Sequence, residues 1–191
     1  VSARDTEGRP VTRLYSRTGE EITQAFPDLV EAIAFDGAID GELLVVRDAR
    51  VETFNVLQQR LNRTQVSMKV VKDYPAHIRA YDLLVDAGID LRDQPFEARR
   101  QRLEAIVAGH TGTRLDLSPL VTFSTWDEAA ALRADPRTGG AGDDADAVEG
   151  LMLKRRAGPY LPGRPKGEWF KWKRDPDLID AVLMYAQRGH G

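Results

Sequence analysis

Two short stretches constrain this chain most strongly: the mainly apolar run V-E-G-L-M-L-K-R-R at 148–156, and W-F-K-W-K-R at 169–174, in which aromatic and basic residues alternate. Their period of two and lack of helical spacing are typical of half-buried strands. Successive side chains of a strand point to opposite faces, so Lys171 and Lys173 should share one face, and Phe170 and Trp172 the other. Two ammonium groups on one face suit a polyphosphate, but lysines also guard exposed sheet edges, and the spacing alone leaves both open.

The segment 148–174 is strongly basic in a chain that is acidic overall. It holds eight Lys and Arg side chains against two glutamates, a local net charge of +6, whereas the whole chain carries −3. This concentration indicates a site for anions. The pI of about 5.7 argues against general coating of nucleic acid, so such contacts should come from this patch. Its cations are Lys154, Arg155, Arg156, Arg164, Lys166, Lys171, Lys173 and Arg174.

Length and composition limit the class of protein. With 191 residues, 42% of them hydrophobic, the chain suits one compact domain, or a domain with a small satellite. The lack of cysteine excludes disulfides and thiolate-based sites, and His77, His110 and His190 are too scattered for a metal site. Apolar runs are far shorter than a membrane span and no signal segment is recognisable, so we expect a soluble, intracellular protein.

The remaining pattern predicts short strands mixed with amphipathic helices. The fold expected is α+β, with two packed, mainly antiparallel β-sheets and flanking helices, because short hairpin-like links favour antiparallel pairing. The polar, glycine-rich segment 135–146 should be mobile. Helices are predicted at 27–34, 55–62, 95–109 and 126–134, the last with a capping signature at Thr125 and Glu128. Strands are predicted at 11–16, 42–46, 50–54, 77–84, 115–123 and 180–186, with a turn at 38–41 and a connection at 69–75.

Three polar or aromatic residues outside the basic segment are candidates for binding a ligand, and each has a plain structural interpretation. Glu42 begins an otherwise apolar strand, where it faces either water, the commoner case, or a ligand. Tyr81, on an alternating strand, is most often a core residue, but an exposed ring on a sheet can stack on a base. Arg17 follows Ser16 in a turn, where a solvated side chain is the plain interpretation.

Five motifs occur in one order along the chain: S-R-T-G, D-G-E-L-L, A-Y-D-L-L, V-E-G-L-M-L-K-R and W-F-K-W-K. Together they resemble the nucleotidyltransferase, or adenylation, domain of ATP-dependent DNA ligases, most closely the bacterial ones. The resemblance covers essentially the whole chain and implies an ATP-grasp-like fold with the nucleotide between two sheets. It implies a three-step reaction: a lysine attacks the α-phosphate of ATP, AMP passes to the 5′-phosphate of a nick, and the 3′-hydroxyl displaces it.

The resemblance implies how ATP is bound. Lys171 and Lys173 would bind its phosphates and serve catalysis, since ammonium groups offset charge on the α-phosphate and on the leaving pyrophosphate. Glu149 would help to hold Mg²⁺ or Mn²⁺, because Mg²⁺ needs only one or two carboxylates beside phosphate oxygens and water. At the nucleoside, the resemblance implies Glu42 on the ribose, Tyr81 stacked on adenine and Lys154 close by.

The resemblance also implies a DNA substrate. Arg17 would lie near the 5′-phosphate of the nick. Arg155, Arg156, Arg164 and Lys166 are expected to form a solvated or DNA-backbone-facing patch rather than catalytic groups. The implied partners are nicked duplex DNA and a C-terminal OB domain, in a monomeric protein of the cytoplasm and nucleoid. The closing D-A-V-L-M-Y-A-Q-R-G-H-G is similar to the passage into that domain. A partial adenylation domain is therefore expected at 1–177 and the start of the OB domain at 178–191.

One part of the family pattern is absent. The attacking lysine of the family lies in a K-x-D-G motif before S-R-x-G, and none of the six lysines here is followed by x-D-G. The two D-G pairs, at 36–37 and 40–41, have Ala34 and Ala38 where the lysine would stand. We therefore expect the chain to begin just after the nucleophile.

Two other functions remain open from the sequence. An RNA ligase or an mRNA-capping guanylyltransferase shares the strand-borne glutamates and lysines, although Y-D-L-L and W-F-K-W-K favour a DNA ligase. A catalytically silent nucleic-acid-binding module would use the basic patch alone. That module predicts salt-sensitive DNA binding that ignores ATP.

The missing lysine gives a direct prediction. Incubated with labelled ATP and Mg²⁺, this 191-residue chain should acquire no acid-stable label, because the amine that forms lysyl-AMP is not part of it. The measurement is the amount of label on acid-precipitated protein. One label per chain would contradict the expectation.

Overall fold

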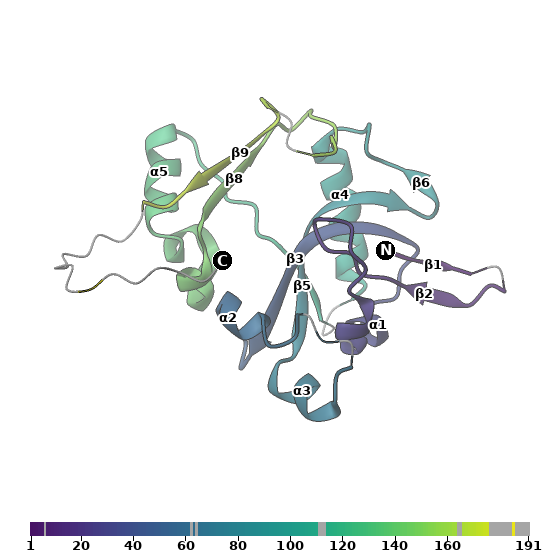
Figure 1. Ribbon diagram of the computed structural model, residues 1–191. Helices are drawn as coiled ribbons and strands as arrows, with labels where there is room; N and C mark the ends of the chain where they lie inside the picture. Colours follow the sequence, from purple (N-terminus) through teal and green to yellow (C-terminus); the bar gives the residue numbers. More distant parts are fainter. Residues whose placement is uncertain are drawn as a thin grey trace.

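The computed structural model describes residues 1–5, 7–61, 63, 65–110, 114–163, 166–175 and 185. Within them, seven strands form a main sheet in the order β2-β1-β3-β5-β6, with β4 paired to β3 and β7 to β5 (Figure 1). Every pairing is antiparallel except that of β5 with β7. The strands are β1 (Ser2–Arg4), β2 (Pro10–Thr12), β3 (Gly37–Arg47), β4 (Arg50–Val51), β5 (Ala76–Asp86), β6 (Ile89–Asp90) and β7 (Leu115–Leu117).

The two long strands β3 and β5 form the centre of this sheet. Their pairing shifts register between Ala38 and Ile39 and again between Asp40 and Gly41, so Asp40 lies between two irregularities. A Cβ on Gly41 would lie 2.9 Å from Cγ2 of Ile78 and 3.0 Å from a backbone oxygen of β5. Glycine therefore permits the close approach of β5, and the irregular pairing re-aims the neighbouring side chains.

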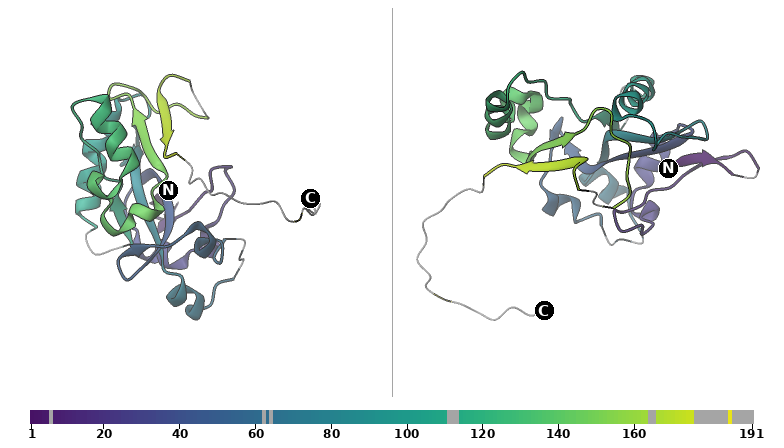
Figure 2. Two further views of the ribbon diagram at one scale, coloured as in Figure 1. Left: turned by 90° about the vertical axis from the view of Figure 1, so that its left-hand side faces the viewer. Right: turned by 90° about the horizontal axis from the view of Figure 1, so that it is seen from above.

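Helices cover the main sheet, and Figure 2 shows α4 and α5 on the same side of the molecule. Pro27 is the first residue of α1, and the Thr125 hydroxyl accepts the Glu128 N–H at the start of α5, as predicted. In the described residues no helix is long and apolar enough to cross a membrane. The helices are η1 (Thr23–Ala25), α1 (Pro27–Ala32), α2 (Phe54–Leu57), α3 (Met68–Asp73), α4 (Phe96–Ala108), α5 (Trp126–Ala134), η2 (Arg137–Ala141) and η3 (Gly142–Ala147).

The basic segment forms a second, two-stranded antiparallel sheet from β8 (Gly150–Lys154) and β9 (Trp169–Lys173). The register places Lys154 opposite Trp169, Met152 opposite Lys171 and Gly150 opposite Lys173. Both strands predicted from the alternation are confirmed. With the helices and the mainly antiparallel main sheet, they confirm the α+β class.

Several predicted elements differ in extent from those observed. The predicted strand 115–123 is confined to β7, the helix 55–62 to α2 and the strand 11–16 to β2. The turn predicted at 38–41 is wrong, because β3 already begins at Gly37, and α3 lies where a connection was predicted at 69–75. The segment 135–146, expected to be mobile, contains η2 and most of η3. Asp144 holds it, since its carboxylate accepts the Val51 N–H at 2.8 Å and pairs with Arg79 at 2.9 Å. The predicted strand 180–186, except Tyr185, lies outside the described residues.

A buried ion pair fixes one end of the main sheet. Arg60 donates two hydrogen bonds to Asp28, at 2.6 and 3.0 Å, and others to the carbonyls of Ala25 and Tyr74. Burial alone would raise the pKa of the Asp28 carboxyl, but bonds from Arg60 and from the Ala76 N–H hold this pKa below its usual value. The resulting stability is present above the ordinary carboxyl pKa and is lost as the pH falls through the lower folded-state value.

Removing the arginine tests how much this ion pair contributes to the free energy of unfolding. Arg60→Ala leaves a buried carboxylate without its main partner, so we expect the free energy of unfolding to fall by about 3–5 kcal/mol. The matched control is Arg102→Ala, because Arg102 pairs with Asp86 at the surface and should contribute less than about 1 kcal/mol. Urea titration measures both, and equal losses would contradict the assignment.

Candidate functional site

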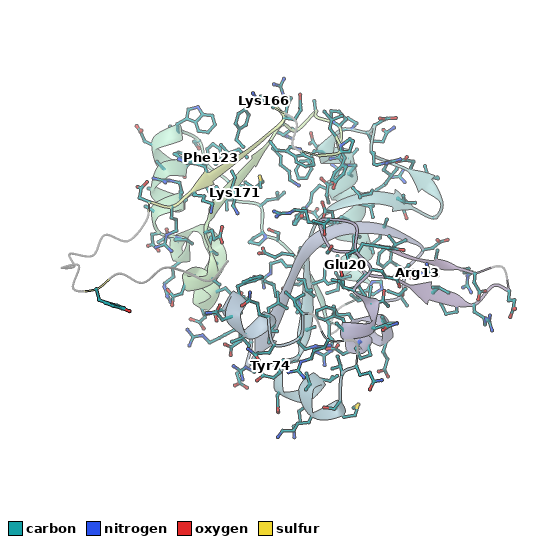
Figure 3. The ribbon with its side chains drawn as sticks, viewed as in Figure 1. Arg13, Glu20, Tyr74, Phe123, Lys166 and Lys171 are labelled. Atoms are coloured by element: carbon teal, nitrogen blue, oxygen red, sulfur yellow. The ribbon has the colours of Figure 1, made fainter. Side chains whose placement is uncertain are left out.

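One face of the small sheet gathers three amines. Lys154, Lys171 and Lys173 share this face, and Phe170 and Trp172 occupy the other, as the alternation predicts. The far face is covered in part by α5, where the rings of Trp126 and Trp172 lie 6.4 Å apart. Figure 3 shows Lys171 on this sheet, in the upper half of the view, and Tyr74 well away from it in the lower half.

Glu149 precedes β8 and contacts both lysines of β9. Its carboxylate accepts a hydrogen bond from Lys171 at 2.8 Å and lies 3.5 Å from Nζ of Lys173. That hydrogen bond, with the charges of both lysines, lowers the pKa of the Glu149 carboxyl. Gly150 permits the approach, because its φ is 144° and a Cβ there would lie 2.2 Å from the Trp172 carbonyl oxygen. All three charged groups are largely exposed, so they stabilise the fold little and remain open to a ligand.

Lys154, at the other end of β8, is buried among aromatic rings. Its Nζ lies 4.6 Å from the ring centre of Tyr81, 4.7 Å from Phe96 and 5.4 Å from Trp169. It also donates to the Asp82 carboxylate at 3.3 Å. Burial lowers the pKa of the Lys154 ammonium, and the nearby Asp82 charge only partly opposes this. This lysine therefore connects the small sheet to β5.

Asp82 is the shared partner of two cations. Both Asp82 and Arg99 have fully buried side chains, and Arg99 donates to Asp82 at 2.7 and 3.1 Å. Arg99, on α4, also donates to the carbonyl of Gly158 in the β8–β9 loop. One carboxylate thus joins β5, α4 and the small sheet.

Tyr81 lies beside this network with its ring half-buried. Its hydroxyl donates to Oδ1 of Asp40 at 2.9 Å, while the hydroxyl of Tyr160 donates to Oδ2 of the same carboxylate at 2.8 Å. Burial raises the pKa of the Tyr81 phenol, and the charges of Asp40 and Glu42 raise it further. Glu42 is exposed on β3, opposite Arg79. Arg79 precedes Tyr81 by two residues on β5, so Glu42 and Tyr81 lie on the same face of the main sheet.

The predicted nucleotide residues therefore form two groups on one surface. Tyr81, Lys154 and Glu42 lie together, while Glu149, Lys171 and Lys173 form the second group. Both groups meet the same face of the small sheet, and β8 separates Glu149 from Lys154 by five residues, roughly 16 Å of extended strand. The arrangement suits an elongated ligand with an aromatic ring at one end and several negative charges at the other.

The predicted DNA-facing arginines lie elsewhere on the surface. Arg17 is exposed in the turn closed by the Tyr15 and Glu21 bridge. Arg155 and Arg156 are largely exposed, and each pairs with a glutamate, at 168 and 97 respectively. They are not part of the two groups just described. Arg164 lies outside the described residues.

A divalent cation would need oxygen ligands from elsewhere at this site. Within the described residues, no group of three or more His, Asp or Glu side chains is placed to hold a metal ion. Glu149 supplies one exposed carboxylate between two ammonium groups. This fits Mg²⁺ or Mn²⁺ only when phosphate oxygens and water complete the coordination shell.

Sequence reasoning missed four residues of this region: Asp40, Asp82, Arg99 and Tyr160. The first two stand inside the quoted motifs D-G-E-L-L and A-Y-D-L-L, so the motifs held a signal that the strand pattern alone did not reveal. The other two carry no comparable signal. One lies on an arginine-rich helix and the other in a loop, and only their burial and hydrogen bonds identify them.

Comparisons with known proteins support the family that the five motifs indicate. A family model described as ATP dependent DNA ligase domain matches residues 6–173. A probable DNA ligase of Koribacter versatilis is 30% identical over 200 residues, covering 96% of this chain and 35% of its own. A DNA ligase of Haloferax volcanii is 32% identical over 195 residues, covering 98% and 31%. The chain thus spans about a third of the length of these relatives.

Solved structures give the same result. A mycobacterial DNA ligase D complexed with ATP and MES superposes with a TM-score of 0.62 at 29% identity, over 91% of this chain and 50% of that one. The ligase domain of LigD from M. tuberculosis gives a TM-score of 0.63 at the same identity and coverage. A Lig E DNA ligase, at 19% identity and a TM-score of 0.57, over 85% of this chain and 56% of that one, shares the fold.

The joining role of Asp82 can be tested by hydrogen exchange. Asp82→Ala leaves two buried cations without their carboxylate, so β8 and β9 should separate more readily from the main sheet. We expect their amide protons to exchange at least about tenfold faster than in the unaltered chain. Asp90→Ala removes a carboxylate from the exposed Arg92 pair and should leave this exchange unchanged. Unchanged exchange in Asp82→Ala would contradict the role.

Proposed function

Since the chain belongs to the ATP-dependent DNA ligase domain family, we propose that it binds ATP along the lysine-bearing face of the small sheet and forms the nucleotide site of a DNA-sealing enzyme. The observation that carries this proposal is the common face of Lys154, Lys171 and Lys173, with Tyr81 at one end and Glu149 at the other. In ATP the aromatic base and the anionic phosphates lie at opposite ends of the molecule, as Tyr81 and the Glu149 group do in the site.

The base is assigned to the ring of Tyr81. Lys154 lies over one face of this ring, so stacking of the base is assigned to the opposite face. A cation held on a tyrosine ring is attracted to its π-electrons, so Lys154 steadies the ring and remains close to the nucleoside. Glu42 lies on the same face of the main sheet as this ring. It is assigned to the ribose hydroxyls, because a carboxylate can accept hydrogen bonds from them.

The phosphates are assigned to Lys171 and Lys173. Both ammonium groups now contact Glu149, and a polyphosphate would compete with this carboxylate for them. Glu149 would then be free to bind Mg²⁺ or Mn²⁺ together with the phosphate oxygens. When bound, the ion supplies further positive charge at the reacting phosphate. The two lysines offset the charge of the transferring group and of pyrophosphate, which is where such reactions gain most from a protein.

The substrate proposed for the transferred AMP is the 5′-phosphate of nicked duplex DNA. The exposed guanidinium groups of Arg17, Arg155 and Arg156 suit a phosphate backbone, which binds through charge and therefore with a strong dependence on salt. An OB domain beyond residue 177, a monomeric state and a place in the nucleoid belong to the same proposal. Sealing of nicks in DNA replication, repair and recombination belongs to the proposal as well.

Loss of one phosphate-binding lysine tests the ATP site. At a ligand concentration 100 times the Kd, MgATP should stabilise the chain by about 2.7 kcal/mol. Lys171→Ala should weaken binding at least about tenfold, which reduces the stabilisation to about 1.4 kcal/mol. Thermal melting with and without MgATP measures this.

The matched control is Lys72→Ala, which removes an exposed lysine on α3. It should keep the full protection by MgATP. If Lys171→Ala were protected as well as the control, the phosphate assignment would be wrong. If the unaltered chain bound DNA in a salt-sensitive manner and ignored ATP, the silent nucleic-acid-binding module would be the better account.

A further inference from the structure

Two tyrosine hydroxyls from distant parts of the chain converge on one carboxylate. Tyr81, on β5, donates to Oδ1 of Asp40, and Tyr160, in the β8–β9 loop, donates to Oδ2. The distances of 2.9 and 2.8 Å are those of well-formed hydrogen bonds to a charged acceptor. Burial raises the pKa of both phenols, and the Asp40 charge raises it further, so both remain hydrogen-bond donors at ordinary pH.

The backbone is shaped to present this carboxylate. The register shifts on both sides of Asp40, and Gly41 has no room for a Cβ against β5. Such irregularities occur where a strand must re-aim a side chain, often next to a functional site. This observation is independent of the hydrogen bonds, and it concerns the same residue.

Tyr160 is itself fixed on three sides. Its N–H donates to the carbonyl of Arg92 at 2.7 Å, and its ring packs edge-on against Trp169 with centroids 5.0 Å apart. The guanidinium of Arg99 lies 5.9 Å from the same ring. A residue held this firmly can restrict the rotamer of the carboxylate to which it donates.

We propose that Asp40 and Tyr160 are positioning residues of the nucleotide site, which hold the Tyr81 ring in the orientation that stacks on the base. The inference rests on the proposed ATP-binding function and adds to it two residues that do not touch the phosphates. A ring attached only at Cβ can rotate about χ1 and χ2. Anchoring its hydroxyl removes this freedom before the ligand arrives, so less of the binding free energy is lost in ordering the ring.

The test compares two ligands on the same protein. ATP uses both the ring and the lysines, whereas inorganic tripolyphosphate offers only the charges that bind Lys171 and Lys173. Tyr160→Phe should weaken ATP binding about threefold and Asp40→Asn about tenfold, as expected when one or both orienting hydrogen bonds are impaired. Neither change should alter the affinity for tripolyphosphate. Calorimetric titration with Mg²⁺ present measures each Kd.

A double variant separates positioning from other effects. In the background of Tyr81→Ala, which has no ring to orient, Tyr160→Phe should cause no further loss of ATP affinity. The matched control is Tyr74→Phe, because Tyr74 lies well away from Lys171 in Figure 3. This variant should bind both ligands like the unaltered chain.

Three results would overturn the inference. ATP affinity unchanged in both Tyr160→Phe and Asp40→Asn would show that the ring needs no such support. Equal losses for ATP and tripolyphosphate would show a general structural role. Full additivity with Tyr81→Ala would show that the two residues act elsewhere. An unaltered chain that bound no ATP would instead overturn the proposed function, and this inference with it.

Discussion

The carboxylate of Asp82 is the interaction on which the rest of the site depends. It is fully buried and takes hydrogen bonds from Arg99 and Lys154, two cations that arrive from α4 and β8. Burying these charges costs free energy, which their mutual pairing and the further bonds of Arg99 to backbone carbonyls offset. Because the small sheet is held to the main sheet through this network, the position of Lys171 relative to Tyr81 follows from it.

The candidate site then follows from strand geometry. Once Lys154 is fixed beside Tyr81, the alternation along β8 and β9 sets Lys171 and Lys173 on the same face, and the positive φ of Gly150 lets Glu149 contact them. The aromatic end is partly buried and held by several hydrogen bonds, while the side chains of the charged end are largely exposed. A fixed aromatic ring suits stacking of a base, and exposed charged side chains suit phosphates that bind together with a metal ion.

Much of this could be predicted from the sequence, because period-two alternation reports which residues share a strand face. It located β8, β9 and the split between Lys171 and Phe170, and the motif order indicated the family. The burial of Lys154 could not be predicted from the local pattern. It is followed directly by two further basic residues, 155 and 156, which are exposed, and no spacing rule distinguishes the three. Nor could the ordering of 135–146, because the partner of Asp144 is Arg79, 65 residues away. Contacts of this kind depend on tertiary structure and leave no local pattern.

The central claim is that one nucleotide spans both groups of residues, and the most direct measurement is a crystal structure of this chain with a non-hydrolysable ATP analogue and Mg²⁺. The account predicts the base on the face of Tyr81 opposite Lys154, and phosphate oxygens within about 3 Å of Lys171 and Lys173 Nζ. A nucleotide bound elsewhere, or one whose phosphates point away from β9, would contradict it.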